Sequence, residues 1–195
     1  GTSTSSAGSG TGSTPLPLPP VVPLVESTSS KPGGSTDPNE LVDQIRQAIF
    51  RCEEALKNRQ DDEFRQHFTR AEQLAANQNL PEQAKFQEQV DDLRVLKQLN
   101  DEFWTAVREN LATKLELGEQ IEFHQHKFEL VARDGEKVEY VLNGEKHSGE
   151  VRQLEPKAAL LIASKTVQWE DPVTFLPIAA FLSVDGKVTD DNERK

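Results

Sequence analysis

The sequence predicts an α+β protein, in which an N-terminal helical hairpin and a long third helix precede a small antiparallel β-meander packed on helices. Two observations predict this architecture. Between residues 37 and 113, apolar residues recur every three or four positions, which is the spacing of amphipathic helices. Residues 115–154 instead alternate apolar and polar side chains, and Asp134-Gly135 and Asn143-Gly144 interrupt this alternation as turn dipeptides do between antiparallel strands.

The first 36 residues differ in composition from the rest of the chain. They consist mostly of Gly, Ser, Thr and Pro, with an apolar, proline-rich centre from Pro15 to Pro23. Such a segment has too little apolar surface to offset the entropy of ordering, so we expect a disordered linker with polyproline II character. It could serve as a spacer, which is the commoner use, or as a ligand for an aromatic groove.

Two amphipathic helices are predicted to follow this linker. Asp37 is a good N-cap and Pro38 a good first helical residue, so the first helix should run from there to about Asn58. The acidic residues 61–63 favour the start of the second helix. Because only a few residues join them, the helices should form an antiparallel hairpin. Their predicted buried residues are Leu41, Ile45, Ala48, Ile49, Cys52, Ala55 and Leu56, then Phe64, Phe68, Ala71, Leu74 and Ala75.

A long third helix is predicted from Pro81 to about Thr113. Its apolar stripe drifts around the axis, as expected over many turns. We expect this helix to link the hairpin to the sheet, with Phe103, Trp104 and Val107 covering the apolar face of the sheet. The stripe comprises Phe86, Val90, Leu93, Leu96, Phe103, Val107 and Leu111.

The Asn143-Gly144 dipeptide predicts the register of the last hairpin. Both central positions of a two-residue hairpin turn need a positive φ, which Asn and Gly tolerate best. This turn pairs Leu142 with Glu145 and Tyr140 with His147.

The preceding turn is predicted as a three-residue loop over residues 133–135. This loop places Leu130 opposite Val138 and Phe128 opposite Tyr140, so that the apolar residues share one side. A two-residue Asp134-Gly135 turn would split them between the two faces of the sheet.

The first hairpin is predicted with a turn from His124 to Lys127. Ile121 would then lie opposite Leu130, and Phe123 opposite Phe128. A sheet with one apolar face must bury that face against helices. The predicted face comprises Ile121, Phe123, Phe128, Leu130, Ala132, Val138, Tyr140 and Leu142.

The C-terminal part reads as a helical tail. Glu155-Pro156 begins a fourth helix, and Asp171-Pro172 turns the chain into an apolar segment, Phe175 to Val184. Thr189-Asp190-Asp191 is typical of a helix cap, so we expect a further helix beyond residue 195. The predicted organisation is a linker over residues 1–36, a helical region over 37–113 and a small α+β domain over 114–195.

Composition excludes several functions. The chain carries 22 basic and 33 acidic residues, for a net charge of −11. Proteins that bind nucleic acids or anionic lipids do so through clustered Lys and Arg, so we expect neither as a partner. No apolar run approaches twenty residues, so no membrane insertion by this segment is expected. The single Cys52 excludes an internal disulfide and should be a buried small hydrophobe.

Three histidines near the meander raise the question of a metal site. A His-x-His pair on one strand would place both rings on one face at a spacing that metal sites use. The predicted register instead places His124 and His126 in a turn and His147 two strands away. We therefore expect no metal site and no cofactor, and we regard His67 as a polar-face residue of the second helix.

Catalytic groups are also not evident. Ser148 follows His147, but neighbours on a strand point to opposite faces, and Cys52 has no histidine that can be placed beside it. Glu119, Glu122 and Glu129 alternate with the apolar set and should lie on the solvent face. We therefore predict no catalytic residue and expect that the chain is not an enzyme.

Two resemblances add to this picture. The pattern Ala48, Ala55, Phe64, Phe68 and Ala71 resembles one tetratricopeptide unit, although no second copy follows. Residues 100–195 resemble uncharacterised proteins of planctomycete bacteria, which have variable helices ahead of a small β-rich module and a helical tail. The resemblance implies no activity, but it suggests an exported or envelope-associated chain, and a cytoplasmic location stays open as the alternative. Its motifs are Phe103-Trp104-x-Ala106-Val107, Leu117-Gly118-Glu119, Tyr140-Val141-Leu142-Asn143-Gly144 and Ala179 to Asp185.

The favoured hypothesis is a non-catalytic protein-interaction or structural module. Its partner would be another protein, met through the groove of the helical hairpin or through a free sheet edge. Two alternatives stay open. The chain could be an accessory domain of an enzyme whose catalytic residues lie outside this sequence, or a small-ligand-binding domain with a pocket between the sheet and Trp104 or Trp169.

Overall fold

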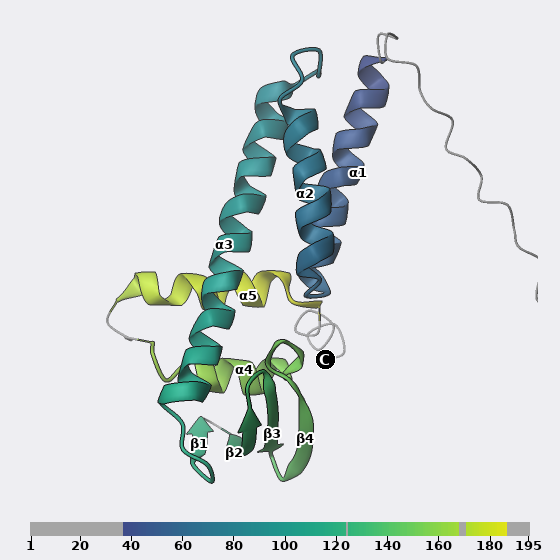
Figure 1. Cartoon of the computed structure of the whole chain (residues 1–195). Helices are drawn as coiled ribbons and strands as arrows, with labels where there is room; N and C mark the ends of the chain where they lie inside the picture. The colour runs from purple at the N-terminus through teal and green to yellow at the C-terminus, as the bar shows by residue number, and fades with distance from the viewer. Residues whose placement is uncertain (1–36, 124, 168–170, 187–195) are drawn as a thin grey trace, which may run out of the picture. The chain divides into compact units, whose positions relative to one another are not determined.

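The computed structural model describes residues 37–123, 125–167 and 171–186, and the fold is α+β as the sequence predicts. Three helices come first, a four-stranded antiparallel sheet follows, and two short helices end the described chain (Figure 1). The predicted linker over residues 1–36, Trp169 and the predicted cap at residues 189–191 lie outside the described residues.

Helices α1 (Pro38–Lys57) and α2 (Asp61–Ala75) form the predicted hairpin. The Asp37 side chain accepts a hydrogen bond from the Asn39 N–H at 2.9 Å, which satisfies one of the free donors at the helix start. All of the predicted apolar residues of α1 and α2 are buried except Phe68, which is half-buried. The hairpin prediction is therefore confirmed.

Helix α3 (Gln83–Thr113) lies against both α1 and α2 and continues to the sheet (Figure 1). It begins after Glu82. This residue has a left-handed backbone conformation, with φ +54°, and so cannot belong to the right-handed helix. Its first half closes a hydrophobic cluster with α1 and α2, and its second half belongs to the cluster under the sheet. Phe103, Trp104 and Val107 lie in this second cluster, as predicted.

The sheet has the order β1-β2-β3-β4, with strands β1 (Gln120–Phe123), β2 (His126–Asp134), β3 (Lys137–Leu142) and β4 (Glu145–Glu150). Asn143 and Gly144 form the turn between β3 and β4 with φ values of +53° and +90°. Leu142 pairs with Glu145 and Tyr140 with His147, so the predicted register of this hairpin is confirmed.

The predicted register between β2 and β3 is wrong. Leu130 pairs with Tyr140 and Phe128 with Leu142, and the turn consists of residues 135–136. A bulge at Val131 separates the part of the ladder near the turn from the rest. The extra residue allows a two-residue turn and a single apolar face to coexist, whereas the sequence interpretation assumed a regular ladder.

The predicted first turn is also too long. Phe123 pairs with His126 and Ile121 with Phe128, so His126 and Lys127 belong to β2. The reason lies in β3 and its turn, because Asn143 holds Lys127 by two hydrogen bonds. Its N–H donates to the Lys127 carbonyl at 2.9 Å, and its Oδ1 accepts from the Lys127 N–H at 2.9 Å.

The apolar face of the sheet is buried against helices. It packs on the second half of α3 and on α4 (Pro156–Ala163), which follows the short 3₁₀ helix η1 (Val151–Gln153). The buried Asn110 amide donates to the Ile162 carbonyl at 2.8 Å and thereby joins α3 to the end of α4. The buried residues of this face are Ile121, Phe128, Leu130, Val138, Tyr140 and Leu142.

The last elements are the 3₁₀ helix η2 (Pro172–Phe175) and α5 (Leu176–Val184), which crosses α3 beneath the helical hairpin (Figure 1). The Asp171 carboxylate accepts from the Val173 N–H at 3.0 Å and caps η2. None of the helices in the described part of the chain combines the length and the apolarity needed to cross a membrane.

Candidate functional site

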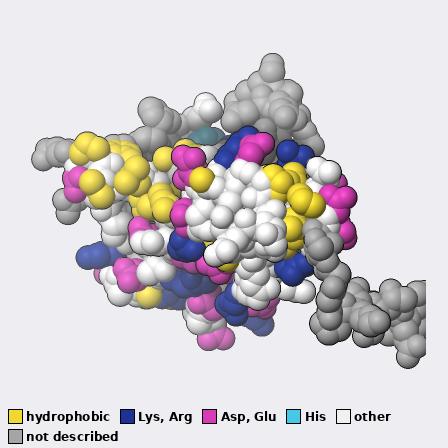
Figure 2. Space-filling model, turned by 90° about the horizontal axis from the view of Figure 1, so that it is seen from above, with side chains coloured by type: hydrophobic (Ala, Val, Ile, Leu, Met, Phe, Trp, Pro, Cys, Tyr) yellow, Lys and Arg dark blue, Asp and Glu magenta, His cyan; other side chains and the backbone are white. Residues whose placement is uncertain are grey.

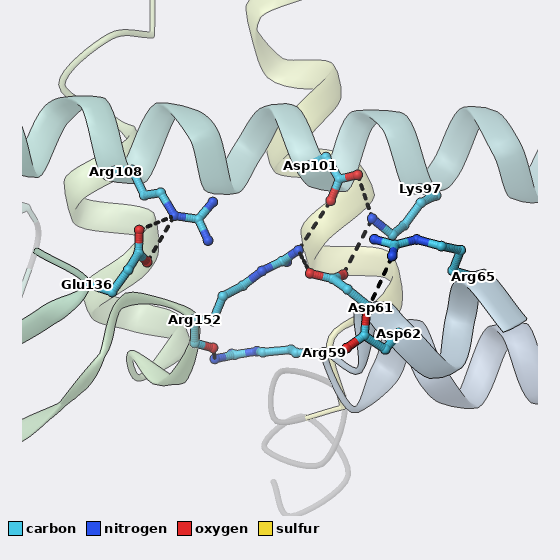
Figure 3. Close-up of polar contacts among 9 residues, drawn as sticks. All are labelled: Arg59, Asp61, Asp62, Arg65, Lys97, Asp101, Arg108, Glu136 and Arg152. Atoms are coloured by element: carbon cyan, nitrogen blue, oxygen red, sulfur yellow. Dashed lines mark hydrogen bonds and ion pairs between the residues drawn. The ribbon is translucent and has the colours of Figure 1, made fainter.

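Charged side chains join the start of α2 to α3 and to η1 (Figure 3). Arg152 of η1 pairs with Asp61 of α2 and, at 3.2 Å, with Asp101 of α3. Lys97 lies between the same two carboxylates, with its Nζ 3.4 Å from Asp61 and 2.5 Å from Asp101. Two cations therefore share two carboxylates where the helical hairpin meets the sheet.

Arg59 lies deeper in the same region. It stands in the short loop between α1 and α2 with φ +59°, and its side chain is only 8% exposed. Its Nε donates to Asp185 at 2.6 Å, and its Nη1 donates to the carbonyls of Arg152 and Leu154, each at 2.8 Å. The guanidinium carbon lies 4.9 Å from the centre of the Trp104 ring. This one side chain thus ties the hairpin loop, the end of α5 and the segment after the sheet together.

This arrangement suits a structural junction better than a catalytic centre. A general acid or base needs a carboxyl group that can exchange a proton with a substrate. Here Asp61 and Asp101 each pair with both Arg152 and Lys97, so protein cations already occupy both carboxylates. Within the described ranges, no group of three or more His, Cys, Asp or Glu side chains could hold a metal ion.

The histidines do not come together. The His126 Nδ1 lies 3.3 Å from the Asn143 Nδ2, so this ring supports the turn between β3 and β4. His147 stacks on Tyr140 with ring centres 5.0 Å apart. Strand β3 separates the two strands that carry His126 and His147, and His124 lies outside the described residues.

The remaining candidate residues from the sequence are Cys52, Glu119 and Ser148, and none of them has the surroundings of a catalytic group. Burial, and to a smaller extent the charge of Glu53, raises the pKa of the Cys52 thiol to about 12, so the reactive thiolate is disfavoured. Glu119 is half-buried, which the sequence interpretation missed, and accepts from the Lys165 Nζ at 2.7 Å. Ser148 is an exposed residue of β4 opposite Glu139.

The predicted ligand pocket beside Trp104 is occupied by protein. Trp104 is fully buried, with Phe103 and Phe181 in edge contact at 5.3 and 5.6 Å between ring centres. A surface hollow of about 470 Å³ at the end of the sheet is lined mainly by polar and charged side chains, among them Asp134, Lys137 and Glu150. Neither place has the apolar lining with a few convergent polar groups that small-molecule sites usually have.

The most unusual surface belongs to η2 and α5. Val173 is 66% exposed, Leu176 49% and Leu182 39%, and α5 buries only Ala180 and Phe181. Hydrophobic side chains gather at the end of the molecule where η2 and α5 begin, beyond α3 (Figures 1 and 2). We call the exposed side of η2 and α5 the α5 face. It comprises Val173, Leu176, Ala179, Leu182 and Ser183.

The sequence interpretation did not identify the α5 face, although it recognised Phe175 to Val184 as apolar. A usable signal was present, because the four residues of η2 and the nine of α5 include no charged residue. In a chain with 28% charged residues, such a run predicts burial somewhere. Whether the chain itself buries it depends on the tertiary structure.

Comparison with known proteins adds no relative. No protein-family model matches the chain, and no curated protein and no solved structure is significantly similar to it. The resemblances to planctomycete proteins and to a tetratricopeptide unit therefore stay predictions.

Proposed function

We propose that this chain is a non-catalytic protein-interaction module and that the α5 face is its recognition surface. The observation that carries the proposal is the exposure of an uncharged, apolar helix on an otherwise charged protein. Val173, Leu176 and Leu182 lie on neighbouring turns and are all well exposed. Contiguous exposed apolar patches of this kind are typical of binding sites for other proteins.

The other exposed apolar residues differ in arrangement. Phe50, Val95, Leu117 and Val131 are also exposed, but they belong to four separate elements or loops. Single exposed apolar residues are normal on soluble proteins and need no partner. Phe50 and Val95 therefore serve as matched controls for the α5 face.

The buried side of α5 is anchored to the rest of the protein by an aromatic contact and an ion pair. Phe181 stacks on Phe103 with ring centres 4.1 Å apart, and Asp185 at the end of α5 pairs with the buried Arg59. A partner would thus meet a preformed surface and would not have to order it, which lowers the entropic cost of binding. The charged junction described above contributes to function by fixing this helix.

The chemistry of the face favours a protein as the partner. It offers neither the Lys and Arg that phosphate groups require nor the basic rim of a helix that lies on anionic lipid. The net charge of −11 points in the same direction.

Affinity capture from a lysate of the native host tests the proposal. The baits are the full chain, a Leu176→Gln/Leu182→Gln variant and a Phe50→Gln/Val95→Gln control, each checked for native folding by circular dichroism. We expect proteins that the wild type and the control retain and the α5-face variant loses. Purified, such a protein should bind the wild type and not the variant in calorimetry. Identical retention by all three baits would contradict the proposal.

A further inference from the structure

We infer that the α5 face binds the same face of a second copy of this chain. The inference rests on the proposed function and names the partner of that surface. Three features support a second copy as the partner, namely the absence of charge from the face, its apolar composition and the spacing of its side chains, and the small area of the face sets the expected affinity.

The first feature is electrostatic. In a two-fold symmetric dimer, each residue near the axis meets its own copy, so any charge there meets a like charge. This is costly for a chain of net charge −11, and a contact region without carboxylates avoids it. The thirteen residues from Pro172 to Val184 form the longest uncharged run in the described chain. A face that recognised a basic partner would instead be expected to carry Asp or Glu.

Composition leads to the same conclusion. The contact surfaces of transient complexes between different proteins are about as polar as the rest of a protein surface, whereas those of homodimers are more apolar. The exposed side of η2 and α5 carries Val173, Leu176, Ala179 and Leu182, with Ser183 as its polar member. In composition, the α5 face therefore resembles the contact surface of a homodimer.

The spacing of the side chains suits an antiparallel pair of helices. Leu176, Ala179 and Leu182 recur at three-residue intervals, and Ser183 lies four residues after Ala179, so all four share one side of α5. A small residue at the centre lets two helix backbones approach closely. With the two-fold axis near Ala179, Leu176 of one copy packs against Leu182 of the other, and both contacts form twice.

The area of the α5 face sets the expected affinity of the dimer. One short helix with one turn of 3₁₀ helix buries less than the roughly 800 Å² per partner of a standard interface. We therefore expect a reversible dimer with a dissociation constant on the order of 10 to 100 µM. Raising the salt concentration should not weaken it, because salt screens the repulsion between two acidic copies.

Analytical ultracentrifugation of the full chain tests this inference over about 5 to 500 µM, a range that brackets the expected constant. We expect the wild type and the Phe50→Gln/Val95→Gln control to shift from monomer to dimer. The Leu176→Gln/Leu182→Gln variant should stay monomeric throughout.

A charge-swap experiment tests the symmetry. Ala179→Glu and Ala179→Lys are both tolerated by a helix surface, and each alone should abolish the dimer because like charges meet near the axis. An equimolar mixture of the two variants should dimerise again. Dimerisation of either variant alone, to the same extent as the wild type, would contradict the symmetric contact.

Two outcomes of the ultracentrifugation experiment would also overturn the inference. A wild-type chain that stays monomeric across the whole range has no self-association to explain. A dimer that persists in the Leu176→Gln/Leu182→Gln variant uses another surface. In the first case, capture of a different protein that depends on the α5 face would still support the proposed function, so the two failures can be told apart.

Discussion

Helices α1 and α5 differ in how far their apolar side chains are buried. Helix α1 carries them on one stripe, which α2, α3 and their neighbours cover, while its remaining surface is largely polar and charged. Helix α5 has no charged residue at all, yet only Ala180 and Phe181 are buried. The same chain thus completes the burial of one helix and leaves the other half-covered.

Apolar composition alone therefore does not identify a core helix. The apolar stripe of α1 is buried because the antiparallel helix α2 packs against it, and α3 also contacts it. Helix α5 crosses α3 (Figure 1), and on its other side Leu176 and Leu182 stay 49% and 39% exposed. An apolar helix in such a position is a surface that can bind.

The largest expected effect concerns the anchor of α5. Phe181→Ala removes a fully buried ring that stacks on Phe103, and we expect it to lower the free energy of unfolding by about 3 to 5 kcal/mol. Phe50→Ala, at a ring that is 54% exposed, should cost less than about 1 kcal/mol. Urea denaturation followed by circular dichroism measures both. Equal losses would mean that α5 is not anchored as described.

The second prediction concerns the ion pair that ends α5. Asp185→Asn leaves the buried Arg59 guanidinium without its carboxylate, and breaking a buried pair on one side costs about 3 kcal/mol. Arg65→Gln removes an exposed partner of Asp62 and should change stability by less than about 0.5 kcal/mol. Thermal and urea denaturation compare the two variants. A negligible effect of Asp185→Asn would remove the Arg59 junction from the account of how α5 is held.

A third experiment compares α1 and α5 directly. Leu56→Ala in α1 empties a buried site and should cost about 2 to 5 kcal/mol. Leu176→Ala in α5 should cost less than about 1 kcal/mol at a protein concentration well below that of dimer formation, because the side chain is half exposed. A loss at Leu176 as large as that at Leu56 would show that α5 is covered within the monomer.

The smallest expected effect is a dependence on pH at the junction of β1 and α4. The Lys165 ammonium and, second, the Glu116 N–H hold the pKa of Glu119 below its usual value. Its contribution to stability is therefore complete above the unfolded-state pKa and is lost as the pH falls through the lower, folded-state pKa. The difference in unfolding free energy between the wild type and Glu119→Gln should shrink on acidification. A difference that stays constant between neutral and strongly acidic pH would contradict this role.

Much of the fold was predictable because it depends on local patterns. The bounds of α1 and α3 and the start of α2 lie within two residues of the prediction, because they follow from apolar spacing and, at α1, from the Asp37 cap. The Asn143-Gly144 turn fixed its own hairpin, because positive φ at both positions is a property of two residues alone. Phe103, Trp104 and Val107 belong to the same buried cluster as the apolar face of the sheet, in agreement with the pattern.

The two strand pairings that were predicted wrongly depend on contacts with more than one strand. The bulge at Val131 is favoured when β2 must present Phe128 and Leu130 to the core and still reach a tight turn, which no local pattern reveals. The length of the first turn is set by Asn143, sixteen residues after Lys127. Such contacts exist only once the neighbouring strand is in place.

The α+β class, the helical hairpin, the long third helix, the net negative charge and the uncharged run from Pro172 to Val184 are all readable from the chain, because spacing and composition are local properties. The meeting of Arg59, Asp185 and Arg152 at one junction and the exposure of one apolar side of α5 depend instead on the packing of the folded chain. Burial depends on which elements lie next to one another, and that is a property of the whole packed chain.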